Sequence, residues 1–215
     1  LSDDLKVVDV VIEVLDARLP LSSANPVLQE LIGSRPTVIA LNKSDLADPV
    51  VTEAWVRFFE KQGRPAALLN AVDGKGIRNL IQKAKQAGAP AMEELTRKGL
   101  RPRPVRVMIM GIPNVGKSSL VNRVVKGALT KTGDKPGVTR GRQWIRVDSD
   151  VDLLDTPGIL PPSLPNQQSA LLLGICGAIK DTIYDSGEAV LELIRQLEIR
   201  YPGKLQQRYL KGGAF

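Results

Sequence analysis

Short apolar runs alternate with amphipathic runs along most of the chain. The apolar runs are rich in β-branched residues, as expected for strands buried on both faces of a parallel sheet. Strands are predicted at residues 7–15, 37–42, 66–71 and 105–110. Helices that end at glycines are predicted at residues 27–33, 51–63 and 77–88. This alternation predicts an α/β fold with a mostly parallel, doubly wound sheet and right-handed crossovers.

The regular pattern weakens in the middle of the chain. From about 89 to 104 the residues lose their periodicity and Pro, Gly and Arg accumulate, which predicts a connector. Beyond the next strand and helix, residues 142–148 and 151–155 are separated by a Ser-Asp turn. They predict an antiparallel hairpin.

After Pro165 only helical patterns remain. They are clearest at 167–179 and 186–201. We therefore expect two domains, an α/β domain over 1–165 and a helical domain over 166–215. The last residues, "KGGAF", do not resemble the end of a completed helical domain, so we expect the second domain to be incomplete.

Composition and charge narrow the function only slightly. Thirty Lys and Arg against 23 Asp and Glu give a net charge of +7 without any His, which suits an anionic partner such as RNA or acidic lipid but also a merely basic enzyme. The single cysteine, Cys176, excludes an internal disulfide and a multi-cysteine zinc site. The longest apolar run, 170–179, is about half of the roughly 20 residues that cross a bilayer, and no signal-peptide pattern opens the chain. We expect no membrane span and a location in the cytoplasm or inside an organelle.

The stretch "GIPNVGKS" at 111–118 matches the phosphate-loop pattern, with Gly111, Gly116, Lys117 and Ser118 at the required spacing. In such a loop the backbone amides and the start of the following helix point at the β-phosphate. The lysine adds positive charge at the β/γ oxygens, and the serine hydroxyl can bind Mg²⁺. An apolar strand before the loop and a helix after it supply the context that this motif requires.

A second motif, "NKSD" at 42–45, also follows a predicted strand. Asp45 can accept two hydrogen bonds from N1–H and the exocyclic amine of guanine, a donor pair that adenine lacks on that edge. Asn42 ties the loop together, and the stem of Lys43 can lie over the base. In isolation these four residues would more often form an ordinary turn.

A third motif, "DTPG" at 155–158, follows the last predicted strand. Asp155 can reach Mg²⁺ through water, and Gly158 can offer its amide to the γ-phosphate. Alone, this tetrapeptide is also typical of a turn. The three motifs together favour a guanine-nucleotide site.

The order of these motifs is unusual, because the base-reading loop precedes the phosphate loop. In this order, and with "DARLPLSSANP" at 16–26, the chain resembles the circularly permuted GTPases, most closely the ribosome biogenesis GTPase A (YlqF/RbgA) family and its mitochondrial relatives. The resemblance covers nearly all of residues 1–165. It implies a P-loop NTPase fold, namely a circularly permuted Ras-like GTPase domain. Strand adjacency rather than chain order builds such a site, so the connector at 89–104 would join the old termini.

The resemblance assigns roles around the phosphates by position. The phosphate loop would comprise Gly111, Asn114, Val115, Gly116, Lys117, Ser118 and Ser119. The residues expected to act in catalysis are Lys117, Thr139 and Gly158. Thr139 matches the switch threonine that completes the Mg²⁺ shell, beside Ser118 and the water-linked Asp155, although Thr130 and Thr132 share its residue type.

Two further roles come from the resemblance. The ribose-side loop at 70–76 has Asn70 where the family carries serine and keeps Ala71, whose backbone amide can contact the base. Asn114 matches an asparagine that accompanies potassium-stimulated hydrolysis, with K⁺ near the phosphates. We therefore expect Mg²⁺ as a cofactor and K⁺ as a second cation, the latter set against a simple loop-stabilising role for the asparagine.

The expected activity is a GTPase that is slow when alone. Ile159 stands where Ras-like GTPases carry the glutamine that orients the attacking water. The family is thought to use a histidine from a segment before the first strand, but this chain begins at Leu1 and contains no His. We expect that the water-positioning group comes from a missing N-terminal segment or from a partner.

The resemblance implies a GTP-hydrolysing assembly factor for the large ribosomal subunit and its rRNA, whose nucleotide state controls ribosome binding. We also expect the protein to be a monomer. It would act in the cytoplasm, or in mitochondria if the source is eukaryotic. The alternative is a guanine-nucleotide-dependent RNA- or protein-binding scaffold with little intrinsic hydrolysis, which Ile159 and the missing His favour for the isolated chain. An ATPase is disfavoured by Asp45.

Overall fold

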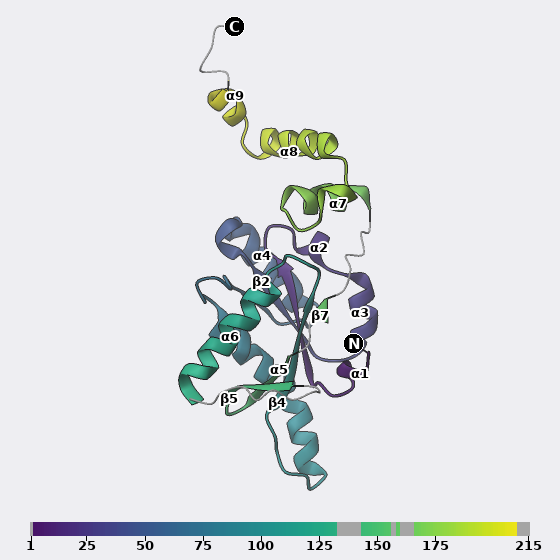
Figure 1. The fold of residues 1–215 in the computed structure, drawn as a ribbon, viewed down its shortest axis with the longest axis vertical. Helices are drawn as coiled ribbons and strands as arrows, with labels where there is room; N and C mark the ends of the chain where they lie inside the picture. The colour runs from purple at the N-terminus through teal and green to yellow at the C-terminus, as the bar shows by residue number, and fades with distance from the viewer. Residues whose placement is uncertain (1, 133–142, 156–157, 160–165, 210–215) are drawn as a thin grey trace. The chain divides into compact units, whose positions relative to one another are not determined.

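The computed structural model describes residues 2–132, 143–155, 158–159 and 166–209. The chain divides into two compact units, Leu1–Ser163 and Leu164–Phe215, and each is described by itself. The first unit is an α/β domain and the second is helical (Figure 1).

Within the described residues, the first unit is built on a sheet of seven strands. The strands are Val10–Asp16 (β1), Thr37–Asn42 (β2), Ala66–Leu68 (β3), Val105–Gly111 (β4), Gln143–Asp148 (β5), Val151–Asp155 (β6) and Gly158–Ile159 (β7). Their order is β3-β2-β1-β4-β6-β5, and β7 pairs with β4. All strand pairings are parallel except the hairpin of β5 and β6. The predicted α/β fold, its mostly parallel sheet and the antiparallel hairpin are confirmed.

One short helix, Ser2–Leu5 (α1), precedes the first strand, and the other helices connect strands of the sheet. The connecting helices are Pro20–Ser23 (α2), Pro26–Ile32 (α3), Pro49–Lys61 (α4), Ile77–Arg97 (α5) and Lys117–Thr132 (α6), with a 3₁₀ turn at Ser44–Leu46 (η1). Side chains cap two helix starts: Oδ1 of Asn25 accepts the amide of Val27 at 3.0 Å, and Oδ1 of Asp48 accepts that of Val50 at 2.8 Å. A proline follows each cap, at a position where the helix needs no N–H.

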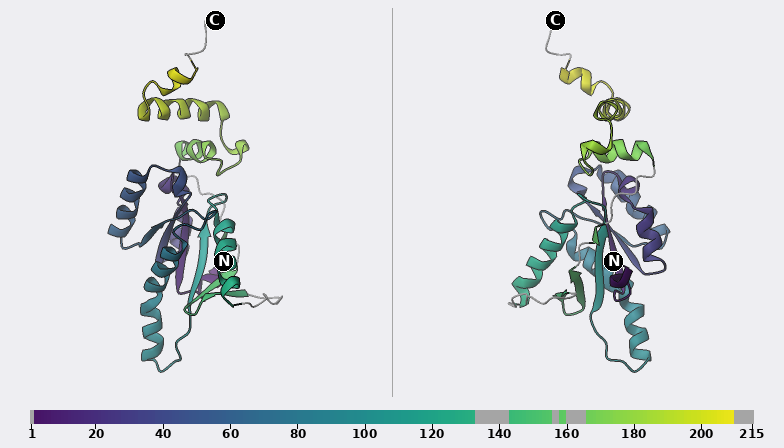
Figure 2. Two further views of the ribbon diagram at one scale, coloured as in Figure 1. Left: turned by 90° about the vertical axis from the view of Figure 1, so that its left-hand side faces the viewer. Right: turned by 45° about the vertical axis from the view of Figure 1, so that its right-hand side comes forward.

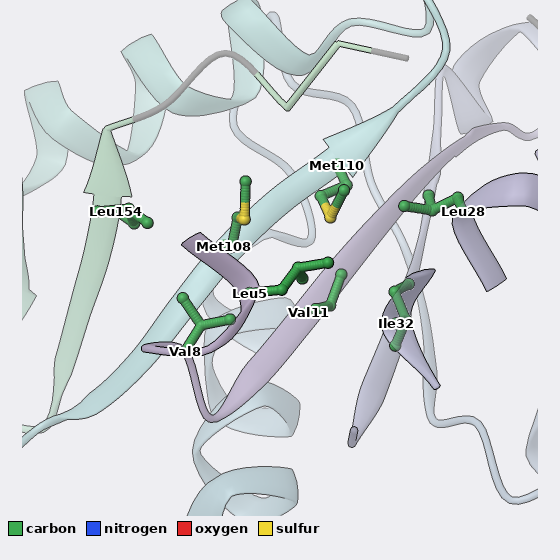
Figure 3. Packing of buried hydrophobic residues seen from close by; sticks show 8 residues of the cluster. All are labelled: Leu5, Val8, Val11, Leu28, Ile32, Met108, Met110 and Leu154. Carbon is green, nitrogen blue, oxygen red and sulfur yellow. The ribbon is translucent and has the colours of Figure 1, made fainter. Parts of the chain in front are cut away.

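Apolar side chains fill both sides of the sheet, around which the helices pack (Figure 2). One cluster, shown in Figure 3, is formed by Leu5, Val8, Val11, Leu28, Ile32, Met108, Met110 and Leu154. A second joins α4 to the sheet through Leu15, Ala17, Ile39, Leu41, Phe59 and Ala66. Alternation along β1 places Val11 and Leu15 on one face and Val10 on the other, where α5 packs.

Helix α5 corrects one expectation. The connector expected from about 89 to 104 is helical over its first part, because α5 continues through Pro90, and only residues 98–104 link it to β4. Gly88, which resembles a helix end in the sequence, lies against Val105, where a Cβ would overlap the valine side chain. The glycine therefore allows close packing, and the proline removes one helical hydrogen bond without ending the helix.

The second unit contains helices Gln167–Ile175 (α7), Ser186–Arg200 (α8) and Lys204–Tyr209 (α9) and a 3₁₀ turn at Asp181–Ile183 (η2). Asn166 caps α7 through the amide of Ser169, and Asp185 caps α8 through the amide of Glu188, both at 2.8 Å. The helical character predicted here is confirmed. None of the helices in the described ranges has both the length and the apolar character that crossing a membrane requires.

Candidate functional site

Three parallel strands end at one edge of the sheet, and each leads into a loop that the sequence singled out. β1 ends at Asp16 and β2 at Asn42, and these two residues are paired in register. β4, which flanks β1 on its other side, ends at Gly111. Because the carboxyl ends of parallel strands share an edge, loops far apart in the sequence come together here.

The phosphate loop leads from β4 into α6. Two of its residues have a left-handed backbone, Asn114 with a φ of 59° and Gly116 with a φ of 98°. Gly116 also needs to be glycine because a Cβ would overlap Nδ2 of Asn42. The loop is thus closed tightly against the base-reading loop. The first amides of α6 have no intrahelical acceptor, so this helix start suits an anion.

Lys117 is the first residue of α6, and its Nζ donates to the carbonyl of Ile112 at 2.5 Å. Burial lowers the pKa of Lys117 from its ordinary value. A negative charge beside a desolvated ammonium stabilises its protonated form, which fits the predicted contact with phosphate oxygens. Ser118 and Ser119 follow in the first turn, and both are exposed.

Asn42 joins three loops. Its Nδ2 donates to the carbonyl of Val115 in the phosphate loop at 2.7 Å, and its Oδ1 accepts the amide of Ala71 in the ribose-side loop at 3.0 Å. The side chain is almost entirely buried, at 3% exposed. A buried carboxamide with both ends bonded is costly to disturb, so this residue fixes the spacing of all three loops.

The ribose-side loop is tied to the base-reading loop through a backbone amide. The amide of Ala71 donates to Oδ1 of Asn42 at 3.0 Å. Asn70 builds the turn itself, because its Oδ1 accepts the amides of Val72 at 2.8 Å and Asp73 at 3.3 Å. Asn70 thus stabilises the turn of this loop, and the backbone of Ala71 is held by Asn42.

Lys43 spans the base-reading and phosphate loops. Its backbone is left-handed, with a φ of 61°, and its Nζ donates to the carbonyl of Asn114 at 2.8 Å. The same ammonium forms an ion pair with Oδ2 of Asp16 at 2.9 Å. The side chain of Lys43 therefore extends from the base-reading loop to the phosphate loop, where its ammonium is held.

The sequence did not single out Asp16 as a site residue. Its side chain is 1% exposed, and Arg18 donates to it from Nε at 2.8 Å and from Nη2 at 2.7 Å. Burial raises the pKa of Asp16, but the hydrogen bonds from Arg18 and Lys43 outweigh burial and hold this pKa below its ordinary value. The signal was present as the first residue of "DARLPLSSANP", which follows a buried strand.

The remaining predicted site residues lie on neighbouring elements. Asp45 is exposed in η1, directly after the base-reading lysine. Gly158 pairs with Met110 of β4, so the "DTPG" glycine lies beside the start of the phosphate loop. β6 is parallel to β4 and ends at Asp155, so this residue follows a strand that ends at the same side of the sheet as β4. Thr139 lies outside the described residues.

A strand, a glycine loop and a helix, with an Asn-Lys-x-Asp loop tied to them by buried hydrogen bonds, define a P-loop GTPase. The base-reading loop comes first in the chain yet lies beside the phosphate loop, because β1 alone separates β2 from β4. The class is therefore that of the circularly permuted GTPases.

Comparisons with known proteins narrow this class. Residues 106–198 match a family model described as a 50S ribosome-binding GTPase. The ribosome biogenesis GTPase A of Bacillus pumilus is 43% identical over 208 residues, which cover 97% of this chain and 74% of that protein. The mitochondrial ribosome-associated GTPase 1 of Bos taurus is 34% identical over 195 residues, 84% of this chain and 56% of that protein. The GNP-bound YlqF structure from T. maritima is 26% identical, with a TM-score of 0.61, and covers 99% of this chain and 75% of that chain.

The chain belongs to the ribosome biogenesis GTPase A family. The resemblance inferred from its motifs is confirmed by a relative that matches almost the whole chain, and the permuted P-loop fold is confirmed with it.

Proposed function

We propose that this chain binds and hydrolyses GTP and acts as a GTP-dependent assembly factor for the large ribosomal subunit. The proposed binding of GTP is supported by Asn42, whose side chain joins the base-reading, ribose-side and phosphate loops. The proposed role in ribosome assembly is supported by membership of the ribosome biogenesis GTPase A family. A net charge of +7 supports an RNA-containing partner.

Asp45 selects guanine in this proposal. Its exposed carboxylate would accept N1–H and the exocyclic amine of the base, which adenine cannot replace. The variant Asp45→Asn should weaken GDP binding about a hundredfold and gain binding of xanthine nucleotides, whose edge is complementary to a carboxamide. The matched control is Asp48→Asn, because asparagine keeps the cap of α4. If Asp45→Asn keeps its preference for GDP, this base assignment is wrong.

Lys117, Ser118, Asp155, Thr139 and Gly158 would hold the phosphates and Mg²⁺. Lys117 and the amides at the start of α6 suit the β/γ oxygens. Ser118 and, in the GTP state, Thr139 would bind Mg²⁺ directly, with Asp155 bound through water. Mg²⁺ supplies charge neutralisation on the phosphate oxygens. Loss of these contacts after hydrolysis would release the switch segments and change affinity for the ribosome.

Hydrolysis by the isolated chain should be slow, because Ile159 cannot hydrogen-bond an attacking water and the chain has no His. We propose that the ribosome stimulates turnover, and that Asn114 takes part in holding K⁺ near the phosphates. Asn114 has a left-handed backbone, and Lys43 fixes its carbonyl. Equal turnover in Na⁺ and K⁺ would remove the potassium role.

The experiment that tests the whole proposal is GTP turnover with purified ribosomal subunits. The proposal predicts stimulation by large subunits and not by small ones. Stimulation by small subunits alone would contradict it. The second candidate, a nucleotide-dependent scaffold, is favoured by Ile159 and predicts GTP-dependent binding of large subunits without faster turnover.

The similarity to both bacterial and mitochondrial proteins supports action in the cytoplasm or, for a eukaryotic source, in mitochondria. We also propose that the protein acts as a monomer, which sedimentation at several protein concentrations would test.

A further inference from the structure

A buried carboxylate lies at the end of the central strand β1, next to the nucleotide loops. Oδ2 of Asp16 is 2.9 Å from Nζ of Lys43, and the same ammonium donates to the carbonyl of Asn114 at 2.8 Å. One cation thus connects the end of β1 to the base-reading loop and the phosphate loop.

Arg18 fixes the orientation of the Asp16 carboxylate. Its guanidinium donates to both carboxylate oxygens, at 2.8 and 2.7 Å, and its backbone amide donates to Oδ1 at 3.1 Å. These bonds leave Oδ2 to accept the ammonium of Lys43 as well. The carboxylate therefore lies between two cations that would otherwise repel each other.

We propose that Asp16 is a positioning residue for the bound nucleotide. By holding Lys43 against the phosphate loop, it keeps the base-reading loop closed over the base and slows nucleotide release. Without the negative charge, the ammonium of Lys43 loses its ion-pair partner and faces the guanidinium of Arg18. The loop then loosens, so release becomes faster, while the association rate changes less. This inference rests on the proposed binding of guanine nucleotides.

The test compares release of a fluorescent GDP analogue from the unmodified chain, Asp16→Asn and a matched control, Asp9→Asn. Asp9 binds Arg103 through both guanidinium ends, at 2.7 and 2.9 Å, just before the other end of β1. Asp16→Asn should release the analogue about tenfold faster, since a hydrogen bond to a charged group is lost. Asp9→Asn should stay within about twofold even though both variants lower the melting temperature.

A double-mutant cycle with Lys43→Met separates positioning from general stability. If Asp16 acts through Lys43, then Asp16→Asn changes release less than about twofold once Lys43 is already methionine. The same tenfold effect in both backgrounds would overturn the proposal, and so would unchanged release from a folded Asp16→Asn variant.

If Asp16→Asn does not fold, the proposal is tested by single variants of the two partners of Asp16. Lys43→Met should speed release more than Arg18→Gln, because Arg18 acts only by orienting the carboxylate. The reverse order would overturn the proposal. If the unmodified chain binds no GDP analogue, the proposed function itself fails and this inference falls with it; if it binds the analogue but Asp16→Asn behaves like Asp9→Asn, only the inference fails.

Discussion

Strand β1 has an aspartate near each end, and the two carboxylates have similar surroundings. Asp9 accepts two hydrogen bonds from Arg103 and one from the amide of Arg106. Asp16 accepts two from the guanidinium of Arg18 and one from its amide. The difference lies in one further partner: within the described residues, Asp16 also binds a lysine that belongs to the base-reading loop.

This difference shows how one kind of interaction serves two purposes. At the amino end, Arg103 lies 94 residues from Asp9 in sequence, so their pair fastens the segment before β4 to the segment before β1. At the carboxyl end, the second cation comes from a loop that reads the base. We therefore expect the pair at Asp9 to act in folding and the pair of Asp16 and Lys43 to act in nucleotide binding.

The largest effect is expected for the variant Lys117→Ala, a change in the phosphate loop that should affect turnover but not folding. It removes the ammonium at the phosphate loop, so GTP turnover should fall by at least about a hundredfold, as for other groups that stabilise phosphoryl charge. The melting temperature should change little, because the lost hydrogen bond to the carbonyl of Ile112 is offset by removal of a partly buried charge. Turnover and thermal unfolding measured on the same sample check both. A clear loss of stability with turnover intact would contradict the expectation that Lys117 serves turnover rather than folding.

A smaller effect is expected from replacing a glycine with alanine, which adds one methyl group, in the phosphate loop or in the turn after α3. In Gly116→Ala the new Cβ would overlap Nδ2 of Asn42, so the phosphate and base-reading loops must separate and GDP affinity should fall at least tenfold. Gly33→Ala is the matched control, since Gly33 has a φ of 61° but no atom within 4 Å of the added Cβ.

Gly33→Ala should lower the free energy of unfolding by about 1–2 kcal/mol through backbone strain and leave GDP affinity unchanged. Titration calorimetry and denaturant unfolding measure the two quantities. Equal losses of GDP affinity in both variants would show that backbone strain, rather than the contact with Asn42, sets the effect.

The smallest expected effect concerns acid stability. The pKa of Asp16 is lowered, because Arg18 and Lys43 outweigh burial, so its contribution is complete above the ordinary value of about 3.9 and is lost as the pH falls through the folded pKa. Glu13, in the middle of β1, has the opposite shift. Burial raises its pKa against the opposing effect of Arg64, so its contribution is greatest at low pH and declines as the pH rises through the folded pKa.

Denaturant unfolding at a series of pH values separates these two carboxyls. Asp16→Asn should reduce the loss of stability below about pH 4, and Glu13→Gln should reduce the decline above it. Curves for both variants that run parallel to the parent would contradict the assigned shifts.

The sequence predicted the strands that end in functional loops, because a buried parallel strand is a continuous apolar run and its motif follows directly. It placed Asn42, Lys117 and Asp155 at strand or helix ends, where the structure has them. These predictions need only local patterns, and the family then adds the roles of the side chains.

What the sequence missed depends on contacts between distant residues. The pair of Asp16 and Lys43 needs the register of β1 with β2, which no local pattern contains. Gly88 was mistaken for a helix end because a glycine that stops a helix and one that permits close packing look alike in sequence. The bond from the amide of Ala71 to Asn42 crosses between two loops, so no local pattern predicts it.

The central claim is that the base-reading, ribose-side and phosphate loops form one site that selects guanine at the carboxyl edge of the sheet. The most direct test is titration calorimetry of the unmodified chain with GDP and with ADP, both with Mg²⁺. Because Asp45 would be left without donors by adenine, GDP should bind at least about a hundredfold more tightly than ADP. Equal affinity for the two nucleotides, or tighter binding of ADP, would contradict the claim.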